Sequence, residues 1–226
     1  MKYPSIENLY ASNGEQNKDI RRGPEYGFSR ESFRQIARWN VEEKLDGTNV
    51  RVLLTGGDGP DHAIRYAGRT DNGQLPPRLL EWLGLNLPVW KVFMAFAKPS
   101  QEHDHDVAPD VILYGEGIGP KIQKAGAGYG GEQRMVLLDV LVGAGEGRRG
   151  HWLRRSSVEE VAWKLGIEVV PLLSWDVDLE TAKTYVSEAS MQQSDEHIEG
   201  IVCKADPPLF DSRGSRVQFK YKIRDL

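Results

Sequence analysis

The sequence contains a single cysteine, Cys203, so no disulfide can form within the chain. A lone cysteine is typical of proteins from reducing compartments rather than of small secreted scaffolds. The opening segment, MKYPSIENLYASNGEQ, lacks the apolar core that a secretory signal needs. We therefore expect an intracellular, cytoplasmic protein.

Long hydrophobic runs are also missing. The most apolar stretch, LPVWKVFMAFA, is interrupted by Lys91 and is far shorter than the roughly 20 residues that a membrane helix requires, so no membrane association is expected. A large excess of one charge is missing as well, because 29 basic and 33 acidic side chains leave a net charge of −4. This balance excludes a uniformly basic nucleic-acid binder but leaves room for a local basic groove.

Internal repeats, low-complexity tails and long linkers are absent from the 226 residues. Glycine and proline are spread in short clusters of turn length. Hydrophobic side chains make up 39% of the chain and six residues are tryptophan, a composition that argues for a proper core and against global disorder. The sequence thus predicts one domain over residues 1–226.

Hydrophobic periodicity outlines the secondary structure. Alternating apolar residues over 50–54 predict a strand entered through the turn-forming pair Asp46-Gly47, and 63–68 predicts its hairpin partner. Helical spacing predicts a helix capped by Ser29 and another capped by Ser156 or Ser157. The expected helices cover 29–38, 79–85, 89–97 and 157–165, and the further strands cover 111–115, 135–142, 200–204 and 217–222. Because helices and strands do not alternate regularly, we expect an α+β domain with mostly antiparallel sheets.

The most informative local pattern is Glu43-Lys44-Leu45-Asp46-Gly47-Thr48-Asn49, in which a lysine stands between carboxylates where a strand ends. Taken alone, so short a pattern is more often a solvated β-turn. Further charged groups follow it in order, most of them within apolar strands or at their ends. They are Gly68-Arg69, Tyr114-Gly115-Glu116-Gly117, Leu138-Asp139, Glu199 to Lys204, and Lys220-Tyr221-Lys222.

Taken together, this ordered series resembles the covalent nucleotidyltransferase superfamily of polynucleotide ligases and mRNA-capping enzymes, most closely its ATP-dependent RNA ligase branch. The resemblance runs from Glu43 to Lys222, nearly the whole chain. It implies the nucleotidyltransferase fold, also called the ligase adenylation domain, in which antiparallel sheets are flanked by helices and the nucleotide site lies between them. A set of motifs in this order is far more specific than any one of them.

The resemblance implies that Lys44 attacks the α-phosphorus of ATP and forms a lysyl-adenylate. Such an attack needs an uncharged amine, whereas an ordinary lysine, with a pKa of about 10.4, is protonated at neutral pH. The site must therefore favour deprotonation through burial, nearby positive charge or a metal ion. Lys220 and Lys222 would supply that charge and hold the α-phosphate from one side of a strand. Asp46 and Glu199 would bind Mg²⁺ or Mn²⁺, which neutralises the triphosphate.

The remaining nucleotide contacts are likewise implied by the resemblance. The backbone beside Glu43 would read the edge of the adenine, and Val202 and Leu138 would form the walls of its slot. Glu116 would bind the ribose, and Arg69 would contact first the ribose and later a nucleic-acid phosphate. Leu138 departs from the family, which usually has an aromatic residue there, so a ring stack worth about 0.5 to 1.5 kcal/mol is lost.

Two further features favour an RNA ligase over its relatives. The chain stops shortly after Lys222, so we expect no OB-fold domain in it, and Asn49, in the nucleotide site, stands where DNA ligases and capping enzymes usually have arginine. The resulting hypothesis is a monomeric RNA repair ligase that joins 5′-phosphate and 3′-hydroxyl ends of RNA, in a single strand or a nicked duplex. DNA end joining, guanylyl transfer as in capping, and a non-catalytic nucleic-acid-binding module of the same fold remain alternatives.

Other conspicuous patterns are interpreted as structural. The glycine-rich run 126–131 lacks the Gly-Lys-Ser/Thr of a phosphate-binding loop, so we expect a flexible loop near the active site. The acidic and histidine-rich run 102–106 is expected to be a solvated loop, and 143–150 a hairpin connection. Cys203 lies inside an apolar strand and is expected to be an inert core residue.

Overall fold

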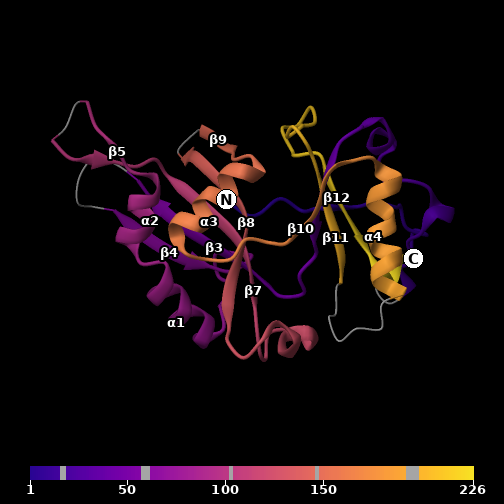
Figure 1. Ribbon diagram of the computed structural model, residues 1–226, viewed down its shortest axis with the longest axis horizontal. Coiled ribbons are helices and arrows are strands. Elements are labelled where there is room, and N and C mark those ends of the chain that lie inside the picture. The colour runs from indigo at the N-terminus through magenta and orange to yellow at the C-terminus, as the bar shows by residue number, and fades with distance from the viewer. Residues whose placement is uncertain (16–18, 57–61, 102–103, 146–147, 192–198) are drawn as a thin grey trace. The chain divides into compact units, whose positions relative to one another are not determined.

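The computed structural model describes residues 1–226 except 16–18, 57–61, 102–103, 146–147 and 192–198. The chain forms two compact units. Unit 1 comprises Met1–Tyr3 and Asp46–Val170, and unit 2 comprises Pro4–Leu45 and Pro171–Leu226. Each unit has a sheet of its own (Figure 1). One domain over 1–226 stays a prediction.

Unit 1 is built on a five-stranded sheet in the order β4-β3-β7-β8-β9. All of its strand pairs are antiparallel. The strands are β3 (Thr48–Thr55), β4 (Ala63–Ala67), β7 (Val111–Ile118), β8 (Arg134–Gly145) and β9 (Arg148–Trp152), with a separate small pair of β5 (Lys98–Pro99) and β6 (Asp106–Val107). The helices are α1 (Pro77–Asn86), α2 (Val89–Phe96) and α3 (Arg155–Leu165), and η4 (Lys124–Tyr129) is a 3₁₀ turn.

The alternation seen in the sequence decides which face of this sheet is buried. Val50, Val52 and Leu54 of β3 pack with the apolar faces of α1, α2 and α3 in one core. The residues of β3 that alternate with them, such as Asn49 and Arg51, belong to the opposite face. The predicted β3–β4 hairpin is confirmed, with Leu54 opposite Ile64. Its loop, 57–61, lies outside the described residues.

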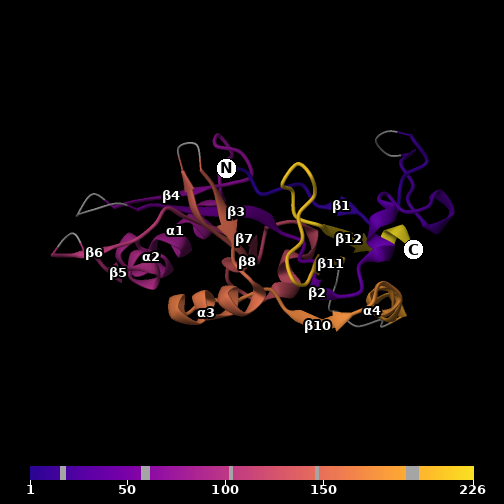
Figure 2. The same ribbon diagram turned by 90° about the horizontal axis from the view of Figure 1, so that it is seen from above.

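Unit 2 is built on a second five-stranded sheet in the order β1-β12-β11-β2-β10. Its strands are β1 (Glu7–Asn8), β2 (Trp39–Glu43), β10 (Leu172–Val177), β11 (Gly200–Ala205) and β12 (Gln218–Lys222). The pairs are antiparallel except that β1 runs parallel to β12. Helix α4 (Leu179–Met191) lies along this sheet (Figure 2), and the short helices are η2 (Pro24–Tyr26), η3 (Glu31–Gln35) and η5 (Ile223–Asp225).

The core of unit 2 lies between α4 and its sheet. Trp39 and Val41 from β2, Cys203 from β11 and Phe219 from β12 are fully buried there. Burial also raises the pKa of the Cys203 thiol. The prediction that this cysteine is an unpaired core residue is therefore confirmed.

The prediction of a helix over 29–38 is wrong. Only a 3₁₀ helix, Glu31–Gln35, forms there, and Arg30 rather than Ser29 precedes it. Tertiary contacts explain the difference, because the Ser29 hydroxyl donates to the Asn8 carbonyl and the Ser29 amide donates to the Leu9 carbonyl. Ser29 is thus bonded to the first strand and its neighbour and is not free to cap a helix.

The predicted cap of the third long helix is also wrong. Helix α3 begins at Arg155, its N-cap position is Arg154, and Ser156 and Ser157 lie inside the helix. The Arg155 guanidinium donates to the Val170 carbonyl and to Glu159 one turn later, which ties the first turn of the helix into unit 1. The other predicted helices and strands are present, with ends that differ by a few residues.

Among the described residues, no single helix has the length and apolar composition needed to cross a membrane, although α1 and α2, joined by a 52° bend, reach them as a pair.

Candidate active site

Lys44 follows the last residue of β2, where two backbone hydrogen bonds fix the chain. Its amide donates to the Gly200 carbonyl at 2.8 Å, and the amide of Glu43 donates to the Pro171 carbonyl at 3.0 Å. Lys44 thus lies beside the start of β11, although 155 residues separate it from Glu199. The predicted lysine at a strand end is confirmed.

Glu199 joins two of the predicted lysines. Its Oε2 lies 2.5 Å from Lys44 Nζ, and its Oε1 accepts a hydrogen bond from Lys222 Nζ. The side chains of Lys44, Glu199 and Lys222 are 21%, 24% and 12% exposed, so the network is mostly enclosed but open to solvent. We call these three residues the lysine–glutamate bridge.

Gly200 explains why a glycine follows this glutamate. Its φ of +153° is rarely adopted by residues with a side chain, and an added Cβ would lie 2.2 Å from the Tyr221 carbonyl oxygen. Gly200 is paired with Lys222 in the β11–β12 register. The close approach of the two backbones therefore brings the Glu199 carboxylate to the end of β12.

The charges at the bridge perturb one another. Burial by itself would raise the pKa of Glu199, but hydrogen bonds from Lys222 and Lys44 outweigh it, so the pKa is lowered. The carboxylate is therefore ionised at neutral pH, and its ion pairs are lost only as the pH falls through that lowered value.

Lys220 lies in the same basic cluster. Burial lowers its pKa, and the positive charges of Lys222, Lys44 and Arg22 lower it further, while Glu199 acts in the opposite direction. Three further basic side chains and one carboxylate therefore act on Lys220. This excess of positive charge favours binding of an anion such as phosphate. The contribution of Arg22 was missed in the sequence, because no motif marks it.

Strand β12 presents its lysines as predicted. Phe219 and Tyr221 are buried in the core of unit 2, whereas Lys220 and Lys222 are half-buried and belong to the opposite face. Val202 of β11 lies directly opposite Lys220. The predicted slot wall and phosphate-binding lysine are thus neighbours on one sheet.

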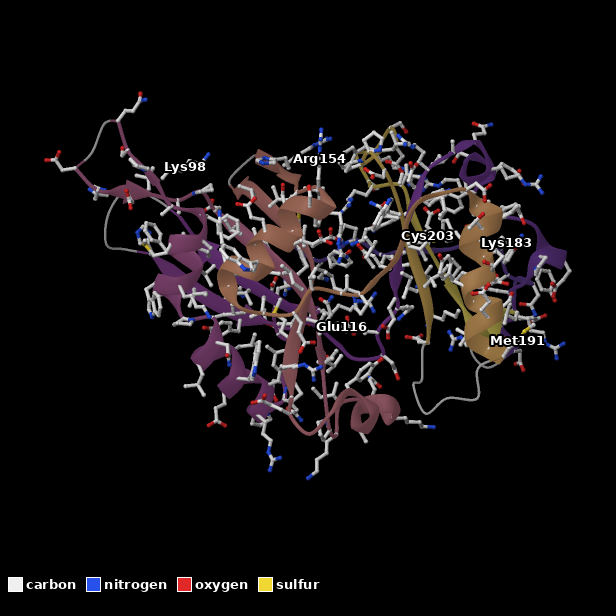
Figure 3. The ribbon with its side chains drawn as sticks, viewed as in Figure 1. Lys98, Glu116, Arg154, Lys183, Met191 and Cys203 are labelled. Atoms are coloured by element: carbon white, nitrogen blue, oxygen red, sulfur yellow. The ribbon has the colours of Figure 1, made fainter. Side chains whose placement is uncertain are left out.

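Unit 1 carries the other predicted site residues. Asn49 on β3 lies directly opposite Glu116 on β7, so the two side chains share a sheet face (Figure 3 labels Glu116). Leu138 is the extra residue of a bulge in β8, because Tyr114 pairs with Asp139 and Gly115 with Leu137. Arg69 is exposed just beyond the end of β4.

The turn that precedes β3 is tightly held. A Cβ on Gly47 would lie 2.3 Å from the Gly117 carbonyl oxygen, so only glycine fits. The Asp46 amide donates to the Tyr129 hydroxyl at 2.9 Å. Tyr129 ends η4, which forms part of the glycine-rich run that was expected to be a loop. A 3₁₀ turn over Lys124–Tyr129 thus helps to fix the backbone of Asp46.

The predicted residues therefore fall into two groups. Unit 2 brings together Glu43, Lys44, Glu199, Val202, Lys220 and Lys222, while unit 1 carries Asp46, Asn49, Arg69, Glu116 and Leu138. The proposed metal ligands Asp46 and Glu199 thus belong to different units. Within the described ranges, no cluster of three or more histidine, cysteine or acidic side chains could hold a metal ion. Residues 102–103 of the acidic run lie outside those ranges.

Three searches relate the chain to known proteins. The RNA ligase family model matches residues 37–222. No match was found among curated proteins. Among solved structures, Naegleria gruberi RNA ligase with PPi is 18% identical with a TM-score of 0.58, and 96% of this chain covers 59% of that one. A mutant of the same ligase with AMP and Mn is 19% identical with a TM-score of 0.55, and 85% of this chain covers 51% of that one.

These similarities define the fold and the family of the chain. The α+β architecture with antiparallel sheets, predicted from the sequence, is the nucleotidyltransferase fold of RNA ligases. The match to the family model covers most of the sequence, and the chain belongs to the RNA ligase family. It spans only about half to three fifths of the length of the solved ligases it resembles.

Proposed function

We propose that this chain carries the nucleotidyltransferase activity of an ATP-dependent RNA ligase. The observation that carries the proposal is the lysine–glutamate bridge, with Lys220 beside it. Cations next to a lysine nucleophile attract the polyphosphate and stabilise the negative charge that builds on it during the attack.

The proposed reaction has three steps. The uncharged Lys44 amine forms a P–N bond with the α-phosphorus of ATP, and the bond to pyrophosphate breaks as the amine loses a proton. A 5′-phosphate oxygen of RNA then attacks the adenylate, and the P–N bond breaks. Finally a 3′-hydroxyl attacks the activated 5′-phosphorus, and AMP leaves. In the first step Lys220 and Lys222 bind the phosphate oxygens on which charge accumulates.

RNA ends are the proposed partner. An RNA 5′-phosphate is itself an anion, so the excess of positive charge around Lys220 and Lys222 suits it as it suits ATP. Family membership supports RNA over DNA as the substrate. Solved N. gruberi RNA ligase contains ATP and Mn in one of its forms, which supports the choice of nucleotide.

A divalent cation fits the residues if it can compete with the two lysines for the Glu199 carboxylate. Mg²⁺ is usually held by one or two carboxylates together with substrate phosphates and water, and Glu199 supplies a partly exposed carboxylate. The ion would neutralise charge on the triphosphate. Because Lys44 and Lys222 already pair with Glu199, a cation there must compete with two ammonium groups.

The proposal is tested by incubating the chain with α-labelled ATP and, separately, α-labelled GTP, each with Mg²⁺ or Mn²⁺. We expect label from ATP to remain on the denatured protein and to be transferred to RNA that bears a 5′-phosphate. Label from GTP alone would indicate guanylyl transfer, and transfer to DNA but not RNA would indicate DNA end joining. Absence of label with either nucleotide would contradict the proposal and favour a binding module.

Removal of either proposed metal ligand should change the metal requirement. We expect Glu199→Ala and Asp46→Ala each to raise the Mg²⁺ concentration that gives half-maximal adenylation by about tenfold. Glu180→Ala is the matched control, because this exposed glutamate on α4 pairs with a lysine one turn away. Unchanged titrations for both variants would remove Glu199 and Asp46 from the metal site.

A further inference from the structure

Arg51 is a fully buried arginine on β3, with 0% of its side chain exposed. Arginine is almost never fully buried unless its charge is paired and its donors are bonded. Its Nε donates to the Gly68 carbonyl at 2.7 Å, one terminal nitrogen donates to Asp71 at 2.9 Å, and the other donates to the Met1 carbonyl at 3.2 Å. Two separate segments of unit 1, the N-terminus and residues 68–71, thus converge on one guanidinium.

Two of these partners bracket Arg69. Gly68 precedes it in the chain and Asp71 follows it by two residues, while Arg69 itself is exposed. Strand β4 ends at Ala67, which is paired with Arg51, and the segment after it turns through a hydrogen bond from the Gly73 amide to the Thr70 carbonyl. The guanidinium therefore fixes both sides of the segment that carries Arg69.

Arg51 lies on the sheet face that carries other predicted nucleotide contacts. Arg51 is two residues beyond Asn49 on β3, so both side chains belong to one face, and Glu116 lies opposite Asn49. The pKa of Asp71 is lowered, mainly by its hydrogen bond from Arg51. Its carboxylate is thus ionised at neutral pH, and the ion pair persists under working conditions.

We propose that Arg51 is a positioning residue, which holds the segment 68–71 so that Arg69 reaches the nucleotide and the RNA phosphate. This inference rests on the proposed function, because Arg69 needs a substrate to contact. The exposed Arg69 side chain has many rotamers, and its guanidinium can therefore occupy many places. Fixing the backbone of 68–71 reduces the number of those places and so favours contact with the substrate. The contrasting role for Arg51 is purely structural, in which its loss would weaken unit 1 without acting through Arg69.

A double-mutant cycle distinguishes the two roles. The cycle compares wild type, Arg51→Met, Arg69→Ala and the double variant, and measures kcat and KM for AMP transfer to 5′-phosphorylated RNA together with thermal unfolding. We expect Arg51→Met to lower kcat/KM by about tenfold when Arg69 is present and by less than about twofold when Arg69 is absent. A structural role would lower it by the same factor in both backgrounds.

Arg65→Met is the matched control. Arg65 is 56% exposed and lies 3.5 Å from Asp71, but no bond joins it to Gly68. Its replacement is expected to leave kcat/KM unchanged. If Arg51→Met fails to fold, Asp71→Ala replaces it in the same cycle, because Asp71 is 62% exposed and its loss frees the 68–71 segment on one side while the Arg51 guanidinium keeps its bonds to the Gly68 and Met1 carbonyls.

Each outcome decides the matter. Equal losses in both Arg69 backgrounds, or no loss on replacing Arg51 or Arg69, would overturn the positioning role while adenylation of the wild type still upholds the proposed function. A wild-type protein that acquires no label would overturn the proposed function and, with it, this inference.

Discussion

Replacing Lys44 with alanine or with arginine is expected to abolish attachment of AMP to the protein while leaving the fold intact. Alanine removes the nucleophile, and arginine stays protonated at any working pH and cannot attack phosphorus. We expect a loss of at least about a thousandfold in labelling with α-labelled ATP.

The structure indicates that neither substitution should unfold the protein. Lys44 is partly exposed, and without it the Glu199 carboxylate still accepts the hydrogen bond from Lys222, so no buried charge is left unpaired. The expected change in the free energy of unfolding is about 1 kcal/mol or less. Lys183→Ala, which removes a lysine on α4 that pairs with Glu180, serves as the control. Label found on the same peptide in either Lys44 variant would disprove the assignment of the nucleophile.

The sequence predicted those parts of the fold whose local pattern and tertiary role agree. The alternation of Val50, Val52 and Leu54 located β3, and the apolar spacing of 79–85 and 89–97 located α1 and α2. Helix α4 was missed although the sequence carries a signal for its start, because Asp178 stands directly before it and aspartate is a preferred N-cap residue. In the structure the Asp178 carboxylate accepts a hydrogen bond from the Thr181 amide at 2.7 Å, as an N-cap does. Strand β10 had a weaker signal, because two irregularities in its pairing with β2 break the two-residue period.

The candidate site could be predicted as a set of residues but not as a network. The order of the motifs indicated Lys44, Glu199 and Lys222, yet the bond of one carboxylate to both lysines depends on the register of β11 with β12 and on the close approach at Gly200. Register is set by long-range pairing, which a local pattern does not contain. In the sequence Arg51 is only the polar neighbour of Val50 and Val52, and nothing near it shows that its partners lie at Gly68 and Asp71.

The second large effect is expected at Lys220 and Lys222. Replacing either with alanine should slow adenylation by about a hundredfold or more, because each removes a cation from the cluster that is proposed to bind the α-phosphate. Arg224→Ala is the matched control, since this arginine lies just beyond β12 and is 71% exposed. It should alter adenylation little and change stability by no more than about 0.5 kcal/mol.

The pH dependence of adenylation separates two contributions of Lys222. If Lys222 mainly keeps Lys44 uncharged, activity of the Lys222→Ala protein should recover as the pH rises toward the range where ordinary lysines lose their proton. If it mainly binds phosphate, the deficit should persist at every pH. Because the pKa of Lys220 is lowered, partly by Lys222, the wild type should lose this cation at a lower pH than the variant does. Near-normal adenylation at neutral pH by both alanine variants would exclude β12 from the active site. It would also remove the main support for phosphate binding by this sheet.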